Sequence, residues 1–227
     1  MARRALRLGA VSMALASADL TLLHLLPAPR LYATTGAVFA YHPWNFLSEL
    51  VRSDYGPLMT ACFFLLALSA LAVGRALHKH AWRWESALLT LAGAALLLLG
   101  FFPTDLADLS TDALTCGLPT RPEPCTLVGR IHNPLSTLVF APIFVAIALC
   151  SVRKERFLTV LAVLCGALML GGVGGATLYL HAIGWHGRWW TGLMQRSLVL
   201  PALLWLAGLL WHLHKKSLHE TPRAGTC

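Results

Sequence analysis

Long runs of apolar residues alternate along the chain with short polar segments. A helix needs about 17 to 25 mostly apolar residues to cross the ~30 Å hydrocarbon layer of a membrane, because each residue rises only ~1.5 Å. The runs that reach this length cover residues 5–26, 56–77, 85–102, 134–152, 157–180 and 193–213. They predict an all-α polytopic membrane protein, in which residues 1–227 form a single six-helix transmembrane domain.

The first apolar run also shares features with a secretory signal peptide. Basic residues precede it, and it contains Ala14-Leu15-Ala16, a tripeptide of the kind that signal peptidases cleave. The run continues past Ala16 as far as Leu26, however, and this favours a first membrane span that is not cleaved. Either alternative leaves the five later runs unchanged.

Composition supports the membrane class, and the charge distribution predicts an orientation. Charged residues make up 12% of the chain, whereas a soluble domain carries about 25%. The net charge of +8 comes mainly from the N-terminus, the connections after the second and fourth runs, and the C-terminal tail. In a six-span protein these four segments lie on one side, and short basic loops stay in the cytoplasm. We therefore predict that both termini are cytoplasmic and that nucleic acid is not a partner. Richness in Ala, Leu and Arg is typical of a bacterium with a GC-rich genome, so the predicted location is the bacterial cytoplasmic membrane.

Two cysteines share one external segment, TCGLPTRPEPCT. Cys116 and Cys125 are separated by a short stretch that contains several prolines. On the oxidising side of the membrane such a pair is expected to form a disulfide. Free thiols remain the alternative. A metal site is not predicted, because neither cysteine has a CxxC partner and His181 and His186 are five residues apart, off the i, i+4 spacing that places two ligands on one helix face.

The external segment before the second span, YHPWNFLSELVRSDYG (41–56), is unusually rich in polar side chains. Its apolar positions recur at helical spacing, which predicts a short amphipathic helix at the membrane interface. Asn45 lies one helical turn before Glu49, and Ser48 is adjacent to Glu49. These three side chains are candidate ligand-binding groups. The alternative is a simple anchor at the level of the lipid headgroups, with its charges in water.

A second polar group brackets the external loop between the third and fourth spans. FFPTD ends the third span with Asp105, and GRIHNPLS opens the fourth with His132. The imidazole of His132 has an ordinary pKa near 6.5, so it is a candidate acid or base. Asp105 is the candidate carboxylate that orients it. The alternative is that Asp105 caps a helix and His132 is a hydrogen-bonded interface residue.

A third polar group opens the last span, where Gln195 and Arg196 begin a long apolar run. A buried arginine in a membrane is costly unless it reaches the interface or finds an acidic partner. Glu49 and Asp105 are the predicted partners on the same face. Gln195 and Arg196 are therefore candidate ligand-binding residues, and snorkelling of Arg196 to the interface is the alternative.

Together these motifs resemble bacterial family 998 of domains of unknown function. The resemblance covers most of the chain and rests on NFLSEL, FFPTD, the histidine that opens the fourth span and the QR that opens the last. It implies a six-helix integral membrane protein without an agreed activity. A fainter similarity, to Frag-type membrane proteins that include the damage-regulated autophagy modulators, implies a lipid- or membrane-associated role. If the motifs carry the family's function, the matching positions are Asn45, Ser48, Glu49, Asp105, His132 and Arg196.

Three hypotheses for the function follow. The first is a polar pocket, facing away from the cytoplasm, that binds a lipid headgroup or small amphiphile. The second is a membrane-embedded lipid hydrolase or transferase with His132 as base and Asp105 as its orienter, although no GxSxG or HExxH motif supports it. The third is a transporter, disfavoured because the two halves of the chain show no repeat. No cofactor is predicted. Membrane lipid is the expected partner, and the sequence identifies no protein partner.

Overall fold

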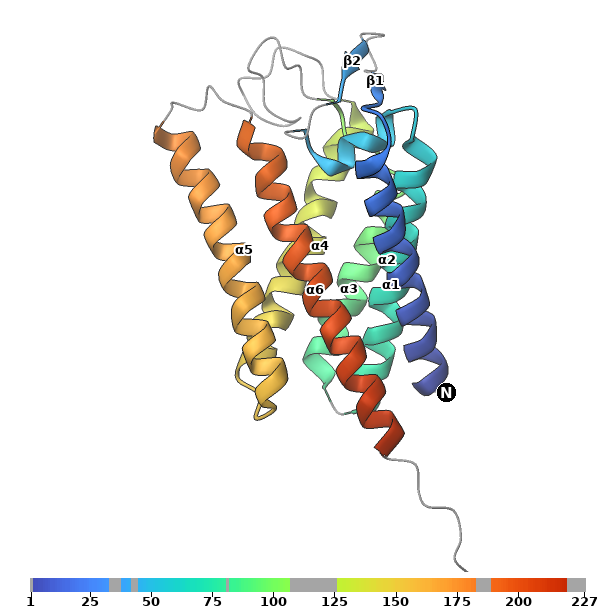
Figure 1. The fold of residues 1–227 in the computed structure, drawn as a ribbon, viewed down its shortest axis with the longest axis vertical. Coiled ribbons are helices and arrows are strands. Elements are labelled where there is room, and N and C mark those ends of the chain that lie inside the picture. The colour runs from blue at the N-terminus through green and yellow to red at the C-terminus, as the bar shows by residue number, and fades with distance from the viewer. Residues whose placement is uncertain are drawn as a thin grey trace, which may run out of the picture.

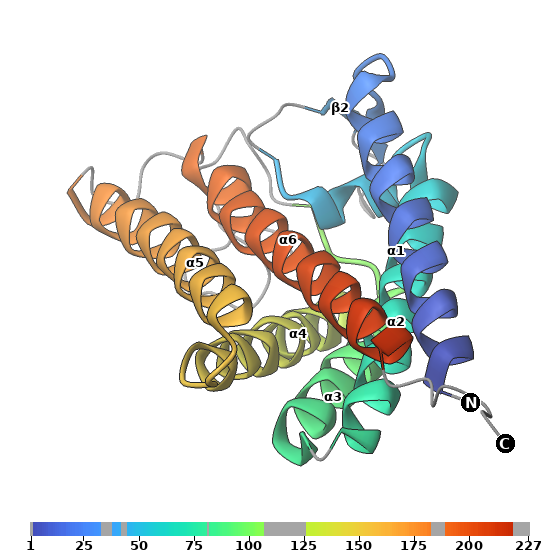
Figure 2. The same cartoon turned by 60° about the horizontal axis from the view of Figure 1, so that its bottom comes forward.

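Helices dominate the computed structural model, which describes residues 2–32, 38–41, 45–80, 82–106, 126–182 and 189–219. Within these ranges lie α1 (Ala2–Leu25), α2 (Gly56–Lys79), α3 (Arg83–Leu99), α4 (Leu127–Ser151), α5 (Arg156–Ala182) and α6 (Trp189–His219). The helices form a ring in which each packs against its neighbours in the sequence (Figures 1 and 2). The last helix, α6, also packs against α1 and so closes the ring. The interior of the ring is filled by apolar side chains such as Trp205, Leu209 and Met169.

Five helices in the described ranges are long and apolar enough to cross a membrane, namely α1, α2, α4, α5 and α6. The predicted class of multi-pass membrane protein is therefore confirmed. α3 is apolar but has only 17 residues. Its length of about 25 Å is slightly less than the thickness of the hydrocarbon layer. The third predicted span, residues 85–102, thus corresponds to a helix that ends at Leu99 and continues into a turn.

The two ends of the ring differ in structure. At one end, here called the terminal end, α1 begins and α6 finishes (Figure 1). There Arg3 Nη2 donates a hydrogen bond of 2.8 Å to the carbonyl oxygen of Ser217. At the other end, here called the hairpin end, two short strands and a 3₁₀ helix lie over the helices (Figure 1).

Small residues allow α1, α2 and α3 to approach closely. Ser69 Oγ donates to the carbonyl oxygen of Gly9 at 3.0 Å, and Ser86 Oγ donates to that of Gly74 at 2.7 Å. A Cβ added at Gly74 would lie only 2.8 Å from Thr90 Oγ1. Such contacts are how helices pack in lipid, where apolar burial alone does not drive helix association.

The hairpin end contains elements that the apolar pattern does not predict. Strands β1 (Arg30–Tyr32) and β2 (Val38–Ala40) pair antiparallel. The 3₁₀ helix η1 (Leu47–Arg52) follows them. Asp54, just after η1, accepts hydrogen bonds from Tyr32 Oη at 2.6 Å and from the Arg30 backbone N–H at 3.1 Å. The hydrogen bond from the Tyr32 hydroxyl holds the pKa of the Asp54 carboxyl below its usual range. These contacts fasten the hairpin to the segment that carries η1.

Helix α4 begins earlier than the sequence predicted. The expected start was Pro134, but the helix starts at Leu127 and Pro134 lies inside it. Thr126 is the N-cap, and its hydroxyl oxygen accepts a hydrogen bond of 3.0 Å from the Gly129 backbone N–H. This is the usual way in which a threonine satisfies a free amide at a helix start. His132 therefore lies within a regular helix and not in the preceding loop.

Candidate functional site

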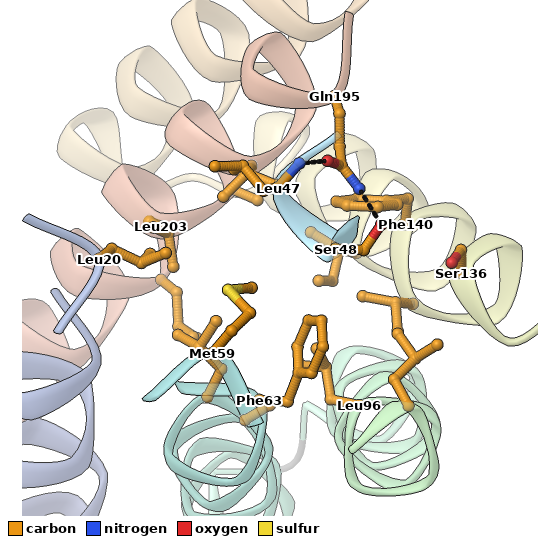
Figure 3. A pocket seen from close by; sticks show the side chains of 18 of the residues that line it. Leu20, Leu47, Ser48, Met59, Phe63, Leu96, Ser136, Phe140, Gln195 and Leu203 are labelled. Carbon is orange, nitrogen blue, oxygen red and sulfur yellow. Dashed lines mark hydrogen bonds between the residues drawn. The ribbon is translucent and has the colours of Figure 1, made fainter. Parts of the chain in front are cut away.

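The 3₁₀ helix η1 is fastened to α6 through Gln195. The side-chain oxygen of Gln195 accepts a hydrogen bond from the backbone N–H of Leu47, and its Nε2 donates to Ser48 Oγ at 3.4 Å (Figure 3). Leu47, Ser48, Glu49 and Leu50 are all buried. The segment 41–56 was predicted to be an amphipathic helix at the interface. It instead contains a short 3₁₀ helix whose centre is packed into the ring of helices.

Arg196 fastens the same segment one residue further along α6. Its guanidinium donates to the carbonyl oxygen of Asn45 at 3.0 Å and to Tyr41 Oη at 2.6 Å. The Asn45 side chain in turn donates to Glu49 Oε2 at 2.7 Å, and Glu49 is only 1% exposed. Burial raises the pKa of the Tyr41 hydroxyl, against the opposing effect of the Arg196 charge. Arg196 thus positions the chain before η1.

Asp105 is the centre of a separate cluster at the start of α4. One carboxylate oxygen accepts from the Thr126 backbone N–H at 2.8 Å, and the other accepts from the Thr126 hydroxyl at 2.7 Å. Arg52, at the end of η1, approaches Asp105 Oδ1 at 3.4 Å and donates to the carbonyl oxygen of Thr104 at 2.8 Å. Asp105 is 3% exposed. The carboxylate therefore joins η1, the segment after α3 and the start of α4.

Glycine at position 129 makes this arrangement possible. A Cβ added to Gly129 would overlap the carboxylate of Asp105. The carboxylate thus occupies the space beside the first turn of α4, where free backbone amides and the helix dipole favour negative charge. The alternative raised by the sequence, that Asp105 caps a helix, describes this geometry. The predicted pairing of Asp105 with Arg196 is wrong, because the cation beside Asp105 is Arg52.

His132 is oriented by a backbone carbonyl and not by Asp105. Its Nδ1 lies 2.7 Å from the carbonyl oxygen of Phe102, which has no proton to give, so Nδ1 carries the hydrogen of this bond. The neutral ring then has its unprotonated nitrogen at Nε2. His132 is 3% exposed, and it lines both of the hollows described next. The prediction that Asp105 orients the ring is therefore replaced by orientation through Phe102.

A largely apolar cavity lies inside the ring beneath η1 (Figure 3). Its volume is about 80 Å³. Most of its wall is aliphatic or aromatic, with side chains such as Met59, Phe63 and Leu203 pointing inward (Figure 3). The polar residues that line it are Ser48, His132, Ser136 and Gln195.

A larger cleft of about 760 Å³ lies between η1, α4 and α6. Its polar lining comprises Ser48, Thr104, Arg130, His132, Asn133, Ser136, Thr137 and Gln195. It shares Phe140, Ala141 and Leu198 with an apolar groove of about 280 Å³. That groove continues along α4, α5 and α6 and is lined further by Phe144, Met169, Leu170 and Val173. The polar cleft and the apolar groove together form one amphipathic surface, here called the α4–α6 cleft.

The structure divides the candidate site residues into three groups. Ser48, Gln195 and His132 line the cleft. Asn45, Glu49 and Arg196 form the network that holds η1 in place, and Asp105 belongs to the cluster around Arg52 and Thr126. Cys116 and Cys125 lie outside the described residues, so their disulfide stays a prediction.

Sequence reasoning missed the polar face that α4 presents to the cleft. Arg130, Asn133 and Thr137 line it together. Their spacing of i, i+3 and i+7 places them on one helical face. The signal was present in the sequence, but it was hidden because the helix was expected to start at Pro134. Among the described residues no group of three or more His, Cys, Asp or Glu side chains lies close enough to hold a metal ion.

Comparison with known proteins gives a family match. A family model described as "Protein of unknown function (DUF998)" matches residues 31–212. The matched range begins in β1 and runs through η1 and α2 to α5 into the last part of α6. It therefore contains every residue that lines the α4–α6 cleft. No curated protein and no solved structure matches the chain.

Proposed function

The chain belongs to the DUF998 family of proteins of unknown function, as its resemblance predicted, and membership brings no activity with it. We propose that the protein binds the headgroup of a membrane lipid or a small amphiphile in the α4–α6 cleft. The observation that carries this proposal is the continuity of a polar cleft with an apolar groove through Phe140, Ala141 and Leu198.

The shape of the cleft fits a molecule with one polar end and one apolar chain. The polar part is lined by hydroxyl, amide and imidazole groups and by one cation, Arg130. Arg130 is exposed, and no ion pair joins it to an acidic side chain in the described part of the chain. A guanidinium can donate two parallel hydrogen bonds to a phosphate. The apolar groove is lined by aliphatic and aromatic side chains, against which an acyl chain can pack.

The orientation of the cleft follows from a six-span topology with both termini in the cytoplasm. α1 begins and α6 ends at the same end of the ring, as an even number of crossings requires. α3 runs along α2 and α4 (Figure 2). We assign the sixth crossing to it. Basic segments in the sequence gather at the terminal end, which short-loop charge assigns to the cytoplasm. The hairpin end, with the polar part of the cleft, then faces away from the cytoplasm of a bacterial cell.

The test is native mass spectrometry of the full chain purified in mild detergent, with bound lipids identified after release. Ala141→Trp places a bulky side chain where the polar and apolar parts of the cleft meet. Ala148→Trp, on an exposed position of the same helix, is the matched control. We expect a defined lipid or amphiphile to copurify with the native chain and with Ala148→Trp but not with Ala141→Trp. Equal retention in all three proteins would refute the proposal.

A second variant tests the polar end. Arg130→Gln should weaken retention of a phosphate-bearing lipid by about tenfold, because hydrogen bonds to a charged group contribute about 1.5–3 kcal/mol before solvent exposure reduces them. Arg30→Gln removes an exposed cation from the same end of the molecule without touching the cleft. Retention that falls equally in both variants would indicate a general charge effect and count against the cleft.

An enzyme acting on lipid is the second candidate, and the geometry of His132 is what favours it. The bond from Nδ1 to Phe102 leaves Nε2 as the basic nitrogen, and His132 lines the cleft together with Ser48 and Ser136. A positioned base beside a hydroxyl is the arrangement needed to activate a nucleophile. His132→Gln should abolish turnover of an added phospholipid while leaving the copurified lipid in place. Absence of turnover by the native chain would leave binding as the function.

A further inference from the structure

A basic cleft lies at the terminal end, on the side of the molecule formed by α2 and α3. Its volume is about 580 Å³, and it is lined by Leu71, Arg75, His78, Lys79, Ser86 and Thr90. We propose that this cleft binds the headgroup of an anionic phospholipid, independently of the α4–α6 cleft. The two sites share no lining residue and lie at opposite ends of the ring.

The cations of this cleft differ from Arg153 and Lys216, at the same end, because acidic side chains do not neutralise them. Arg153 pairs with Glu85, which is fully buried, and its guanidinium also lies 4.7 Å from the centre of the Trp82 ring. Lys216 pairs with Glu155 at 3.1 Å. In the described part of the chain, no salt bridge joins an acid to Arg75 or Lys79.

The two hydroxyl groups of the cleft already donate hydrogen bonds within the protein. Ser86 Oγ donates to the carbonyl oxygen of Gly74 at 2.7 Å, and Thr90 Oγ1 donates to that of Ser86 at 2.8 Å. Their protons are therefore already used within the protein. The charged ends of Arg75 and Lys79 remain, and both residues are exposed. An anionic acceptor such as a phosphate makes the strongest hydrogen bonds to these donors, because it also offsets their charge.

The sequence of α2 indicates a lipid rather than a free phosphate. Arg75 and Lys79 are one helical turn apart, and Leu71 and Leu68 precede them on the same face. Leu68 is 39% exposed, so the apolar surface continues from the basic cleft toward the middle of α2. Basic residues at the end of a membrane helix attract anionic headgroups, while the apolar face next to them remains against acyl chains. A phospholipid can place its phosphate at Arg75 and Lys79 and its acyl chains along Leu68 and Leu71. It therefore matches both the basic cleft and the apolar surface next to it.

The test is a native mass spectrometry titration of the full chain with dioleoylphosphatidylglycerol and, separately, with the zwitterionic dioleoylphosphatidylcholine. We expect tighter binding of the anionic lipid. The double variant Arg75→Gln, Lys79→Gln should weaken that binding roughly 25-fold, because each cation near the membrane surface contributes roughly fivefold. The control Arg4→Gln, Lys154→Gln removes the same charge from exposed positions at this end that do not line the cleft.

Three outcomes would overturn the inference. Equal affinity of the native chain for both lipids would show that the charge of the headgroup does not determine binding. Equal weakening by the two double variants would show a diffuse charge effect instead of a site. Competition by deacylated glycerophosphoglycerol at the same concentration as the lipid would show that the ligand is a free phosphate ester. Arg130→Gln should leave the difference in affinity between the anionic and the zwitterionic lipid unchanged, because both lipids carry the phosphate that the α4–α6 cleft would bind. Failure here is therefore distinguishable from failure of the proposed function. All variants alter exposed side chains, and an unchanged thermal midpoint verifies that they fold.

Discussion

Asp105 offers the sharpest test of the fold around the candidate site, because two roles predict different results for it. The geometry assigns it a structural role, in which its carboxylate joins η1 to the start of α4. As the orienter of a catalytic histidine it would matter for turnover but little for stability. Asp105→Ala and Asp105→Asn separate the two roles.

The expected loss of stability follows from the contacts of the carboxylate. Thr126 donates two hydrogen bonds to it, of 2.8 and 2.7 Å. Hydrogen bonds to a charged group contribute about 1.5–3 kcal/mol each, and bonds that share one partner are not fully additive. The longer contact with Arg52, at 3.4 Å and partly exposed, adds less than about 1 kcal/mol. Asp105→Ala should therefore lower the free energy of unfolding by about 3–4 kcal/mol.

The amide in Asp105→Asn can keep one acceptor for Thr126 but loses the charge. Its cost should be about 1–2 kcal/mol, between the native chain and the alanine variant. Thermal unfolding in detergent, followed by tryptophan fluorescence, measures the order of the three midpoints. Asp54→Ala, whose carboxylate is exposed, is the control and should shift the midpoint far less. An alanine variant as stable as the native chain would refute the structural role.

Three further expectations can be checked on the same preparations. Gly129→Ala should destabilise the bundle by about 1–3 kcal/mol, because the added Cβ overlaps the Asp105 carboxylate. Gly171→Ala is the control, since its added Cβ meets open space, and it should be neutral or slightly stabilising in the same unfolding assay. Burial raises the pKa of the Glu155 carboxyl, but the Lys216 ammonium and the His212 imidazole together lower it by more. The pKa of Glu155 therefore lies below its usual value. The resulting stability is present above the unfolded-state pKa and lost as pH falls through the folded-state pKa, so Glu155→Gln should flatten the acid limb of a midpoint-against-pH curve. Cys116 should react with an impermeant maleimide only after reduction; reaction beforehand would refute the disulfide.

The helices could be predicted from the sequence because membrane insertion imposes a simple rule of length and apolarity. Five of the apolar runs correspond to helices that satisfy this rule. The start of α4 could not be placed in the same way. Its first turns carry Arg130, His132 and Asn133, so they lack the apolar signal. Pro134 also imitates a helix start, although it is tolerated inside this helix.

The composition of the site could be predicted only in part. Polar residues at helix ends stand out in the sequence, but their partners depend on contacts between segments far apart in the chain. Arg196 was expected to meet an acid and instead donates to the hydroxyl of Tyr41 and a backbone carbonyl. A backbone acceptor carries no sequence signal, because every residue has one. The same reason explains why the bond between His132 and Phe102 was not foreseen.

The location of a bound lipid tests the central claim most directly. A phospholipid with a photoreactive group in its acyl chain can be incorporated with the native chain, cross-linked by light and mapped by peptide sequencing. The cleft predicts that cross-links concentrate on residues 140–144 of α4, 169–173 of α5 and Leu198, and that Ala141→Trp removes them while Ala148→Trp does not. Cross-links spread evenly over the exposed leucines of α5, such as Leu164 and Leu178, and insensitive to Ala141→Trp, would contradict it.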